Sequence, residues 1–298
     1  MRRVGGTLNR RNYLQTCFSL LLGPASSWAQ QRGATTPSLP EDWVCPMHPE
    51  VRSAKPGVCP RCGMTLALNI RDSGEYPLEV SHSPELIKPG AEVSLTLRVF
   101  NPGSGQPVKY FDIVHEKLMH LFVVSENLEF FAHTHPLPQA DGSFRVQLRL
   151  PFGGMYRLLA DYFPSGAAPQ LSVKTLFVSG HSKPGKLAPA RGPSKSENLA
   201  ASLRLDPEQP IAGLETKMFF TLEPAVGLEL YLGSWAHMLV ASEDLIDLLH
   251  LHPIFADGGP SVQFNLIFPR PCVYRLWTQF QRKGVVNTMA FTAQVKAL

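Results

Sequence analysis

Short segments of alternating hydrophobic and polar residues recur along the chain and predict β-strands. The alternation runs through residues 93–99 and 144–150, and more loosely through 218–222. Such a period of two places one face of a strand against a core and the other in solvent. Residues 121–124 and 156–160 are apolar almost throughout, which indicates buried strands. Since no long amphipathic helical pattern competes with these segments, we expect a mainly β fold.

Turn-forming residues separate these segments. The chain has 27 prolines and 23 glycines, and pairs such as Pro89-Gly90 and Asp141-Gly142 fall between predicted strands. Short strands joined by such turns, in units of about 100 residues, are typical of an immunoglobulin-like or cupredoxin-like β-sandwich. Both topologies remain open at this point.

The chain contains an internal repeat. Residues 119–128, MHLFVVSENL, reappear as residues 236–245, AHMLVASEDL, and His133-Thr134-His135-Pro136 reappears as His250-Leu251-His252-Pro253. A fixed-order recurrence of this kind indicates a duplicated structural unit. We therefore predict one sandwich over residues 75–180 and a second over residues 200–298, joined by a Pro, Gly, Ser and Lys-rich linker over residues 181–199.

Each copy has the same pattern of three histidines. A single His is followed thirteen residues later by a His-x-His pair, which gives His120, His133 and His135 in the first copy and His237, His250 and His252 in the second. Residues two apart on a strand face the same side, and a strand, a turn and a return strand can bring the third imidazole opposite them. Three such nitrogens suit copper or zinc, with water or a carboxylate such as Glu126 or Glu243 in a fourth position.

The alternative for these histidines is structural. Histidines at the end of a strand also satisfy backbone groups at the rim of a sandwich, and duplication would preserve them in both copies. The first copy also carries His115 and Asp161, where the second has Leu232 and Gln279. His115 and Asp161 are weaker ligand candidates, and we favour their interpretation as surface polar groups.

Four metal donors lie close together near the amino terminus. Cys45 and His48 form one C-x2-H knuckle, and Cys59 and Cys62 form a C-x2-C knuckle. Two donors on each of two tight turns can close around one tetrahedral ion. A structural zinc knuckle and a Cys59–Cys62 disulfide are the alternatives.

Residues 44–66, with CPMHP, then Pro56-Gly57 and CPRCGM, resemble the heavy-metal-binding domain found on copper and silver efflux adaptor proteins and copper-transporting P-type ATPases. We expect this domain to span residues 43–70. The resemblance implies Cys45, His48, Cys59 and Cys62 as ligands, with Met47 and Met64 as soft auxiliary donors for Cu(I) or Ag(I).

The first 29 residues resemble a twin-arginine signal peptide. Arg10-Arg11 precedes an apolar stretch from Cys17 to Gly23 and a small-x-small cleavage site ending at Ala29. We therefore expect cleavage near Gln30, a linker over residues 30–42, and a periplasmic or secreted protein. Four arginines and no acids lie in the leader, so they account for the whole formal charge of +4. The mature chain is then formally neutral, so it offers no basic field for nucleic acid. No apolar run of about eighteen residues follows the leader, so the sequence predicts no membrane span.

Together these patterns predict an exported heavy-metal-binding protein with a copper or zinc ion. We expect it to capture, buffer or deliver metal, with copper favoured, for a metal efflux or resistance component. A metalloenzyme with a three-histidine copper or zinc centre is the second hypothesis, although spacing identifies no general base, which favours a binding protein over an enzyme. In a third, the sandwiches are interaction modules for an efflux partner, and only the small domain binds metal.

Overall fold

The computed structural model describes residues 43–45, 51–60, 66–68, 74–182, 187–188 and 190–298. Among these residues the elements of secondary structure are all β-strands, which confirms the mainly β prediction. None of the described residues forms a helix that is long and apolar enough to cross a bilayer. The predicted signal peptide, the linker over residues 30–42, and Met47, His48, Cys62 and Met64 lie outside the described residues.

The small amino-terminal domain has a three-stranded antiparallel sheet. Its order is β2 (Arg52–Ser53), β1 (Trp43–Val44), β3 (Ala67–Leu68), and Val44 pairs with Arg52 on one side and Ala67 on the other. Cys45 and Cys59 are buried together with Leu66. Val114, from the first repeat, packs against this cluster.

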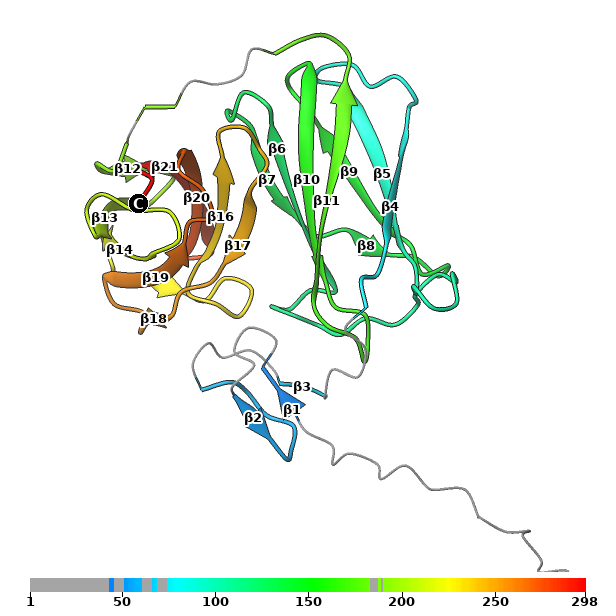
Figure 1. Cartoon of the computed structure of the whole chain (residues 1–298), viewed down its shortest axis with the longest axis horizontal. Coiled ribbons are helices and arrows are strands. Elements are labelled where there is room, and N and C mark those ends of the chain that lie inside the picture. Colours follow the sequence, from blue (N-terminus) through cyan, green and yellow to red (C-terminus); the bar gives the residue numbers. More distant parts are fainter. Residues whose placement is uncertain (1–42, 46–50, 61–65, 69–73, 183–186, 189) are drawn as a thin grey trace, which may run out of the picture. The chain divides into compact units, whose positions relative to one another are not determined.

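The first repeat is a sandwich of two antiparallel four-stranded sheets, seen as two layers in Figure 1. One sheet has the order β4 (Leu78–Ser83), β5 (Glu92–Val99), β9 (Phe144–Arg149), β8 (Leu137–Pro138). The other has the order β11 (Gln170–Val178), β10 (Gly154–Tyr162), β6 (Met119–Ser125), β7 (Phe131–Thr134). Alternate side chains of β5, such as Val93, Leu95 and Leu97, enter the core between the sheets, as the sequence pattern predicts.

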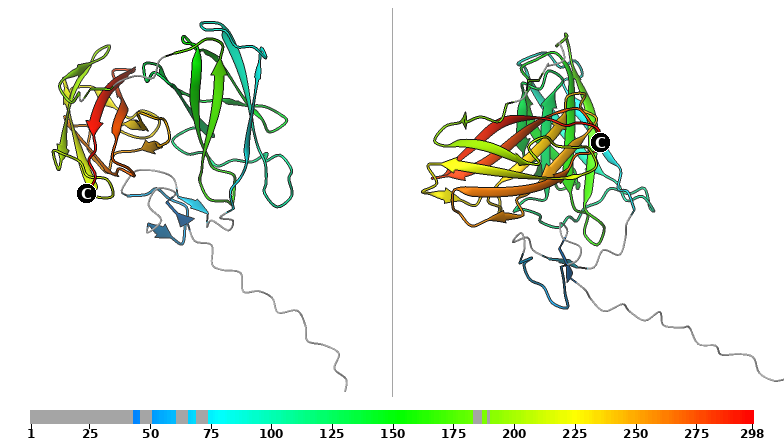
Figure 2. Two further views of the ribbon diagram at one scale, coloured as in Figure 1. Left: turned by 45° about the horizontal axis from the view of Figure 1, so that its top comes forward. Right: turned by 60° about the vertical axis from the view of Figure 1, so that its left-hand side comes forward.

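The second repeat has the same arrangement with additional short strands (Figure 2). Its outer sheet has the order β12 (Ser194–Lys195), β13 (Ala200–Asp206), β14 (Glu215–Glu223), β19 (Ser261–Ile267), β18 (Phe255–Ala256). Its other sheet has the order β15 (Leu228–Glu229), β20 (Val273–Arg282), β16 (His237–Ser242), β17 (Leu248–Leu251), and β21 (Val285–Gln294) also pairs with β20. β12 lies inside the predicted linker of residues 181–199, where Ser194 pairs with Ala201.

Strands β6 and β16 are buried on both faces. One face of β6 enters the core of its own sandwich, whereas Phe122 and Val124 on the other face pack against Leu239 and Trp277 of the second repeat. The rings of Phe131 and Trp277 stack with centroids 5.2 Å apart and planes at 11°. The continuous apolar character of residues 121–124 therefore reflects a core on one side and the contact between repeats on the other.

Candidate metal centre

The three histidines of the first repeat lie side by side at one end of its β6–β7 hairpin. His120 lies on β6, His133 on β7 and His135 just after β7. Nδ1 of His120 lies 3.0 Å from Nε2 of His133, and the three residues each offer a nitrogen within 4.8 Å of the others. The hairpin geometry expected from the thirteen-residue spacing is thus present.

Hydrogen bonds fix the tautomers of two of these rings. Nε2 of His120 lies 3.0 Å from the backbone oxygen of Val114, and Nδ1 of His133 lies 2.7 Å from Oε1 of Gln279. Because both oxygens can only accept, each ring must donate there. A neutral ring carries one proton, so His120 Nδ1 and His133 Nε2 both present lone pairs to each other. Two lone pairs at 3.0 Å repel unless a cation lies near both.

The second repeat has the matching arrangement. Nε2 of His237 donates to the backbone oxygen of Tyr231 at 2.9 Å, and Nδ1 of His250 donates to Oδ2 of Asp161 at 2.8 Å. The remaining nitrogens, His237 Nδ1 and His250 Nε2, face each other at 3.4 Å. Nε2 of His252 lies 3.0 Å from the same His237 nitrogen. The two repeats therefore use the same backbone acceptor, six residues upstream, to aim the first histidine.

Each repeat supplies a hydrogen-bond acceptor to a histidine of the other. Asp161 of β10 receives His250, and Gln279 of β20 receives His133. Asp161 pairs with His120 across β10 and β6, and Gln279 pairs with His237 across β20 and β16, so the two acceptors occupy equivalent positions. Our interpretation of Asp161 as a surface group is wrong, because the contact between the repeats covers it. The sequence offered one signal for this role. Both copies carry a residue with a side-chain oxygen acceptor, Asp161 or Gln279, after the Tyr-Arg-Leu segment.

His115 is a histidine that the sequence patterns did not place in the cluster. It is 7% exposed, and its ring stacks on His252 with centroids 3.8 Å apart and lies 5.2 Å from the ring of His237. The ligand atoms of these three residues lie within 4.8 Å of one another. The expectation of a surface polar group is therefore wrong, because the turn that carries His115 is directed into the second repeat.

That turn has an unusual backbone. Val114 and Lys117 exchange two backbone hydrogen bonds, and the residues between them, His115 and Glu116, have φ values of 47° and 64°. Positive φ at both central positions defines a type I′ turn, in which Gly or Asn is normally preferred. Leu232 of the second repeat has the same conformation with φ 51°, so both repeats share this turn shape.

Burial keeps six of these histidines in the neutral form. Desolvation, followed by the neighbouring imidazoles, lowers the pKa of His133 to about 2, of His115 and His135 to about 3, and of His120 to about 4. The pKa values of His237 and His252 also fall well below the usual 6.5, for the same reasons. Neutral imidazoles are the form that binds metal. No proton is therefore held between His120 and His133 at neutral pH.

Several buried ring nitrogens in the described residues have no hydrogen-bond partner. They are Nε2 of His115, Nε2 of His135 and Nδ1 of His252. A buried polar nitrogen without a partner costs about 1–3 kcal/mol, so three in one cluster are difficult to explain by structure alone. Glu126 does not supply a fourth ligand to this cluster, since it accepts the backbone N–H of Met155 at 3.3 Å, and Glu243 is exposed.

The two sets differ in their access to solvent. His135 lines a cavity of about 490 Å³ together with Leu137, Arg145 and Gln147. His237 and His252 are only 1% and 6% exposed. The first set can therefore exchange a ligand with solution through the cavity, whereas the second is enclosed.

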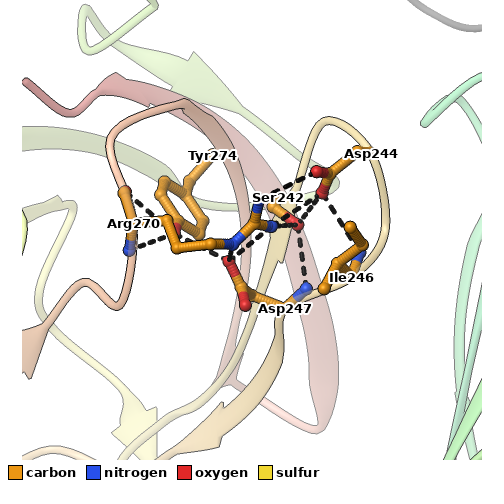
Figure 3. A network of polar contacts seen from close by, with 6 residues as sticks. All are labelled: Ser242, Asp244, Ile246, Asp247, Arg270 and Tyr274. Carbon is orange, nitrogen blue, oxygen red and sulfur yellow. Dashed lines mark hydrogen bonds and ion pairs between the residues drawn. The ribbon is translucent and has the colours of Figure 1, made fainter.

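An ionic network holds the loop between β16 and β17 in place (Figure 3). Arg270 donates to Asp247 and to Asp244 at 3.0 Å each, and Tyr274 donates to Asp247 at 2.9 Å. Ser242 donates to Asp244 and accepts the backbone N–H of Asp247. This network fixes the register of the hairpin that carries His237 and His250. At the equivalent positions the first repeat has Phe130 and Phe152 for Asp247 and Arg270, and both pack against its apolar core.

Two of the four predicted ligands of the amino-terminal site lie among the described residues. Cys45 and Cys59 lie in one buried cluster, as a shared ligand set requires. Their predicted companions His48, Cys62, Met47 and Met64 lie outside the described residues, and so does the Cys59–Cys62 disulfide alternative.

Comparisons with known families identify two regions. The heavy metal binding domain family matches residues 43–67, which confirms the resemblance noted in the sequence and supports metal binding. The family described as a domain of unknown function, DUF8832, matches residues 71–175 and 196–297, more than two thirds of the chain.

Similar proteins were also found among metal transporters. A copper-transporting P-type ATPase from Rhizobium leguminosarum bv. viciae is 47% identical over 45 residues, which make up 15% of this chain and 5% of the ATPase. A silver exporting P-type ATPase from Salmonella typhimurium is 67% identical over 24 residues, 8% of this chain and 3% of the ATPase. The chain thus spans only a small fraction of either relative.

Two solved structures illustrate the structural comparison. The Escherichia coli adhesin FdeC aligns over 78% of this chain and 68% of its own with 15% identity and a TM-score of 0.26. Fibronectin(III)-like modules of Clostridium thermocellum CbhA align over 74% and 95% with 12% identity and a TM-score of 0.21. Scores this low support no argument about function.

Proposed function

The chain belongs to the family of the domain of unknown function DUF8832, and from this premise we propose that it is an exported protein that captures and buffers copper. Its small domain supplies thiolates, which prefer soft ions such as Cu(I), and its paired sandwiches supply imidazoles, which also bind copper. The similarity to a copper-transporting and a silver exporting P-type ATPase supports copper as the cargo. The resemblance of the first 29 residues to a twin-arginine signal peptide supports export to the periplasm, where a metal efflux or resistance component would receive the ion.

The opposed lone pairs of His120 and His133 carry the proposal for the sandwiches. Their nitrogens are 3.0 Å apart, close to the spacing of about 3.3 Å between two nitrogens bound to one tetrahedral ion at about 2.0 Å. His135 brings a third nitrogen, and the cavity beside it leaves room for a fourth ligand. Three ligands with an open position suit an ion that must be taken up and released.

Contact between the small domain and the first repeat supports transfer between these two sites. Val114 packs against the cluster of Cys45 and Cys59, and the backbone oxygen of Val114 holds the His120 ring. An ion released by the thiolates would therefore meet the histidines after a short path. This proposal places capture at the small domain and storage at His120, His133 and His135.

Metal analysis of two double variants tests the proposal. Cys45→Ser/Cys59→Ser and His133→Gln/His135→Gln are loaded with copper in the full-length protein, and bound copper per chain is measured by elemental analysis. Each variant should lose part of the copper that the wild type holds. If the His133→Gln/His135→Gln protein kept the full wild-type amount, the sandwich site would be excluded.

A metalloenzyme is the second candidate function, and the cavity beside His135 favours it. Arg145 and Gln147 line that cavity, so a small anionic substrate could reach an ion held by the first set. Turnover of an oxidisable reporter by the copper-loaded protein, abolished in His133→Gln/His135→Gln and retained in Cys45→Ser/Cys59→Ser, would select the enzyme over the buffer.

A further inference from the structure

The histidines of the second repeat and His115 of the first form an enclosed set with a different character from the open one. His115, His237 and His252 are all less than one tenth exposed. His135 of the open set, in contrast, lines a cavity of about 490 Å³. We propose that His115, His237 and His252 hold a second metal ion that stays bound and joins the two repeats.

The donor set crosses between the repeats. His237 and His252 come from the second repeat, and His115 comes from the turn between residues 114 and 117 of the first. Nε2 of His250 lies 3.4 Å from Nδ1 of His237, about the spacing of two nitrogens on one tetrahedral ion, and offers a fourth donor. Four protein ligands without an open position are the pattern of a structural zinc site.

The hydrogen bonds around the set prepare these rings to bind a cation. Backbone oxygen of Tyr231, the carboxylate of Asp161 and the backbone of Leu232 hold His237, His250 and His115 from their outer sides. Ligating histidines commonly donate their second ring nitrogen in this way, which fixes the tautomer and the ring orientation. Nε2 of His115 has no hydrogen-bond partner in the structure, and the three residues of the set each offer a ligand atom within 4.8 Å of the others.

The difference between the repeats explains why only one such set exists among the described residues. At the position of His115 the second repeat has Leu232, in the same left-handed conformation with φ 51°. The turn of the second repeat therefore sends no imidazole toward His120 and His133. His120, His133 and His135 therefore remain a set of three histidines beside a cavity. The second set gains His115 as a further donor and is enclosed.

Retention of zinc by a His115→Leu variant tests this proposal. Leucine occupies the same turn position and the same φ in the second repeat, so the backbone should tolerate it. The full-length protein carries Cys45→Ser/Cys59→Ser throughout, so that the small domain contributes no thiolate pair. Samples are loaded with Zn²⁺, exposed to excess EDTA, passed over a desalting column and assayed for zinc.

The unmodified cluster should retain about one zinc per chain through the EDTA step, and His115→Leu should retain none. His181→Gln, which removes an exposed histidine outside the cluster, is the matched control and should retain its zinc. His135→Gln should lower zinc only before EDTA. Equal retention by His115→Leu and its parent, or no retained zinc in the parent, would overturn the proposal.

Thermal unfolding keeps the test valid if His115→Leu is less stable. Zinc should raise the unfolding midpoint of the parent and of His181→Gln, but raise that of His115→Leu and of a second variant, His252→Gln, much less. An equal rise in all four proteins contradicts the proposal. If the protein retained zinc but took up no copper at His133 and His135, the enclosed metal site would be supported and the proposed copper buffer would be excluded.

Discussion

The carboxylate of Asp161 and the imidazole of His250 lie 2.8 Å apart, although they belong to different repeats. The reverse bond, from His133 to Gln279, joins the same two sheets. Each histidine set is therefore oriented by the neighbouring sandwich, and neither repeat alone contains the complete arrangement. Duplication here brought the histidines of both copies together at the contact between them.

Removal of the Asp161 carboxylate should weaken metal binding without touching a ligand. In Asp161→Ala, Nδ1 of His250 loses its acceptor, so the ring is free to turn and to change tautomer. We expect a loss of zinc affinity of about 10- to 100-fold, measured by competition with a chromophoric chelator. Asp141→Ala removes an exposed carboxylate that pairs with Arg98 and should leave the affinity unchanged. Equal affinities of Asp161→Ala and the wild type would show that the hydrogen bond does not orient a ligand.

Trp277 should be a main contributor to the stability of the paired sandwiches. It is 4% exposed, packs in the cluster between the repeats and stacks on Phe131. Trp277→Ala leaves a large cavity and should reduce the free energy of unfolding by about 3–5 kcal/mol, measured by urea denaturation. Phe177→Ala, which truncates a ring that is 70% exposed, should change it by less than about 0.5 kcal/mol. A small effect of Trp277→Ala would indicate that the repeats separate easily.

The Asp244 carboxylate should contribute stability that disappears in acid. Its hydrogen bond to Arg270, which is the largest favourable contribution, and that from Ser242 lower its pKa below the usual 3.8. A depressed folded-state pKa adds stability that is fully present above pH 3.8 and is lost as the pH falls through the folded value. The wild type should therefore exceed Asp244→Asn in urea midpoint at pH 6, and the gap should narrow as the pH falls below 3.8. A gap independent of pH would mean that the charge of Asp244 is not responsible.

The hairpin between β20 and β21 should accept a stabilising substitution. Lys283 and Gly284 have φ values of 48° and 73°, so they form a type I′ turn, and Asn-Gly is the preferred pair for this turn. Lys283→Asn should raise the free energy of unfolding by roughly 0.5–1 kcal/mol, measured by urea denaturation. Lys296→Asn removes the same charge at an exposed residue without positive φ and should give no gain. If both substitutions had the same effect, turn conformation would not be the cause.

Strand positions and the duplication follow closely from the residues. The alternation over residues 93–99 and 144–150 corresponds to β5 (Glu92–Val99) and β9 (Phe144–Arg149), because burial on one face of a strand imposes a period of two. The grouping of His120, His133 and His135 was also predictable, since a hairpin brings residues of known spacing together. β12 was not predicted, since a two-residue strand carries no period and lies in a segment rich in turn-forming residues.

The sequence by itself determined the class of fold, the two related sandwiches, the metal-binding domain at residues 43–67 and the histidine triplets within each copy. These features depend on local periods and spacings, which a linear chain records directly. Only the tertiary structure decided that the triplets meet, that Asp161 holds His250 and that His115 reaches His237 and His252. Those contacts depend on how the apolar faces of β6 and β16 pack against each other, and two faces of similar composition carry no sequence mark of their partner.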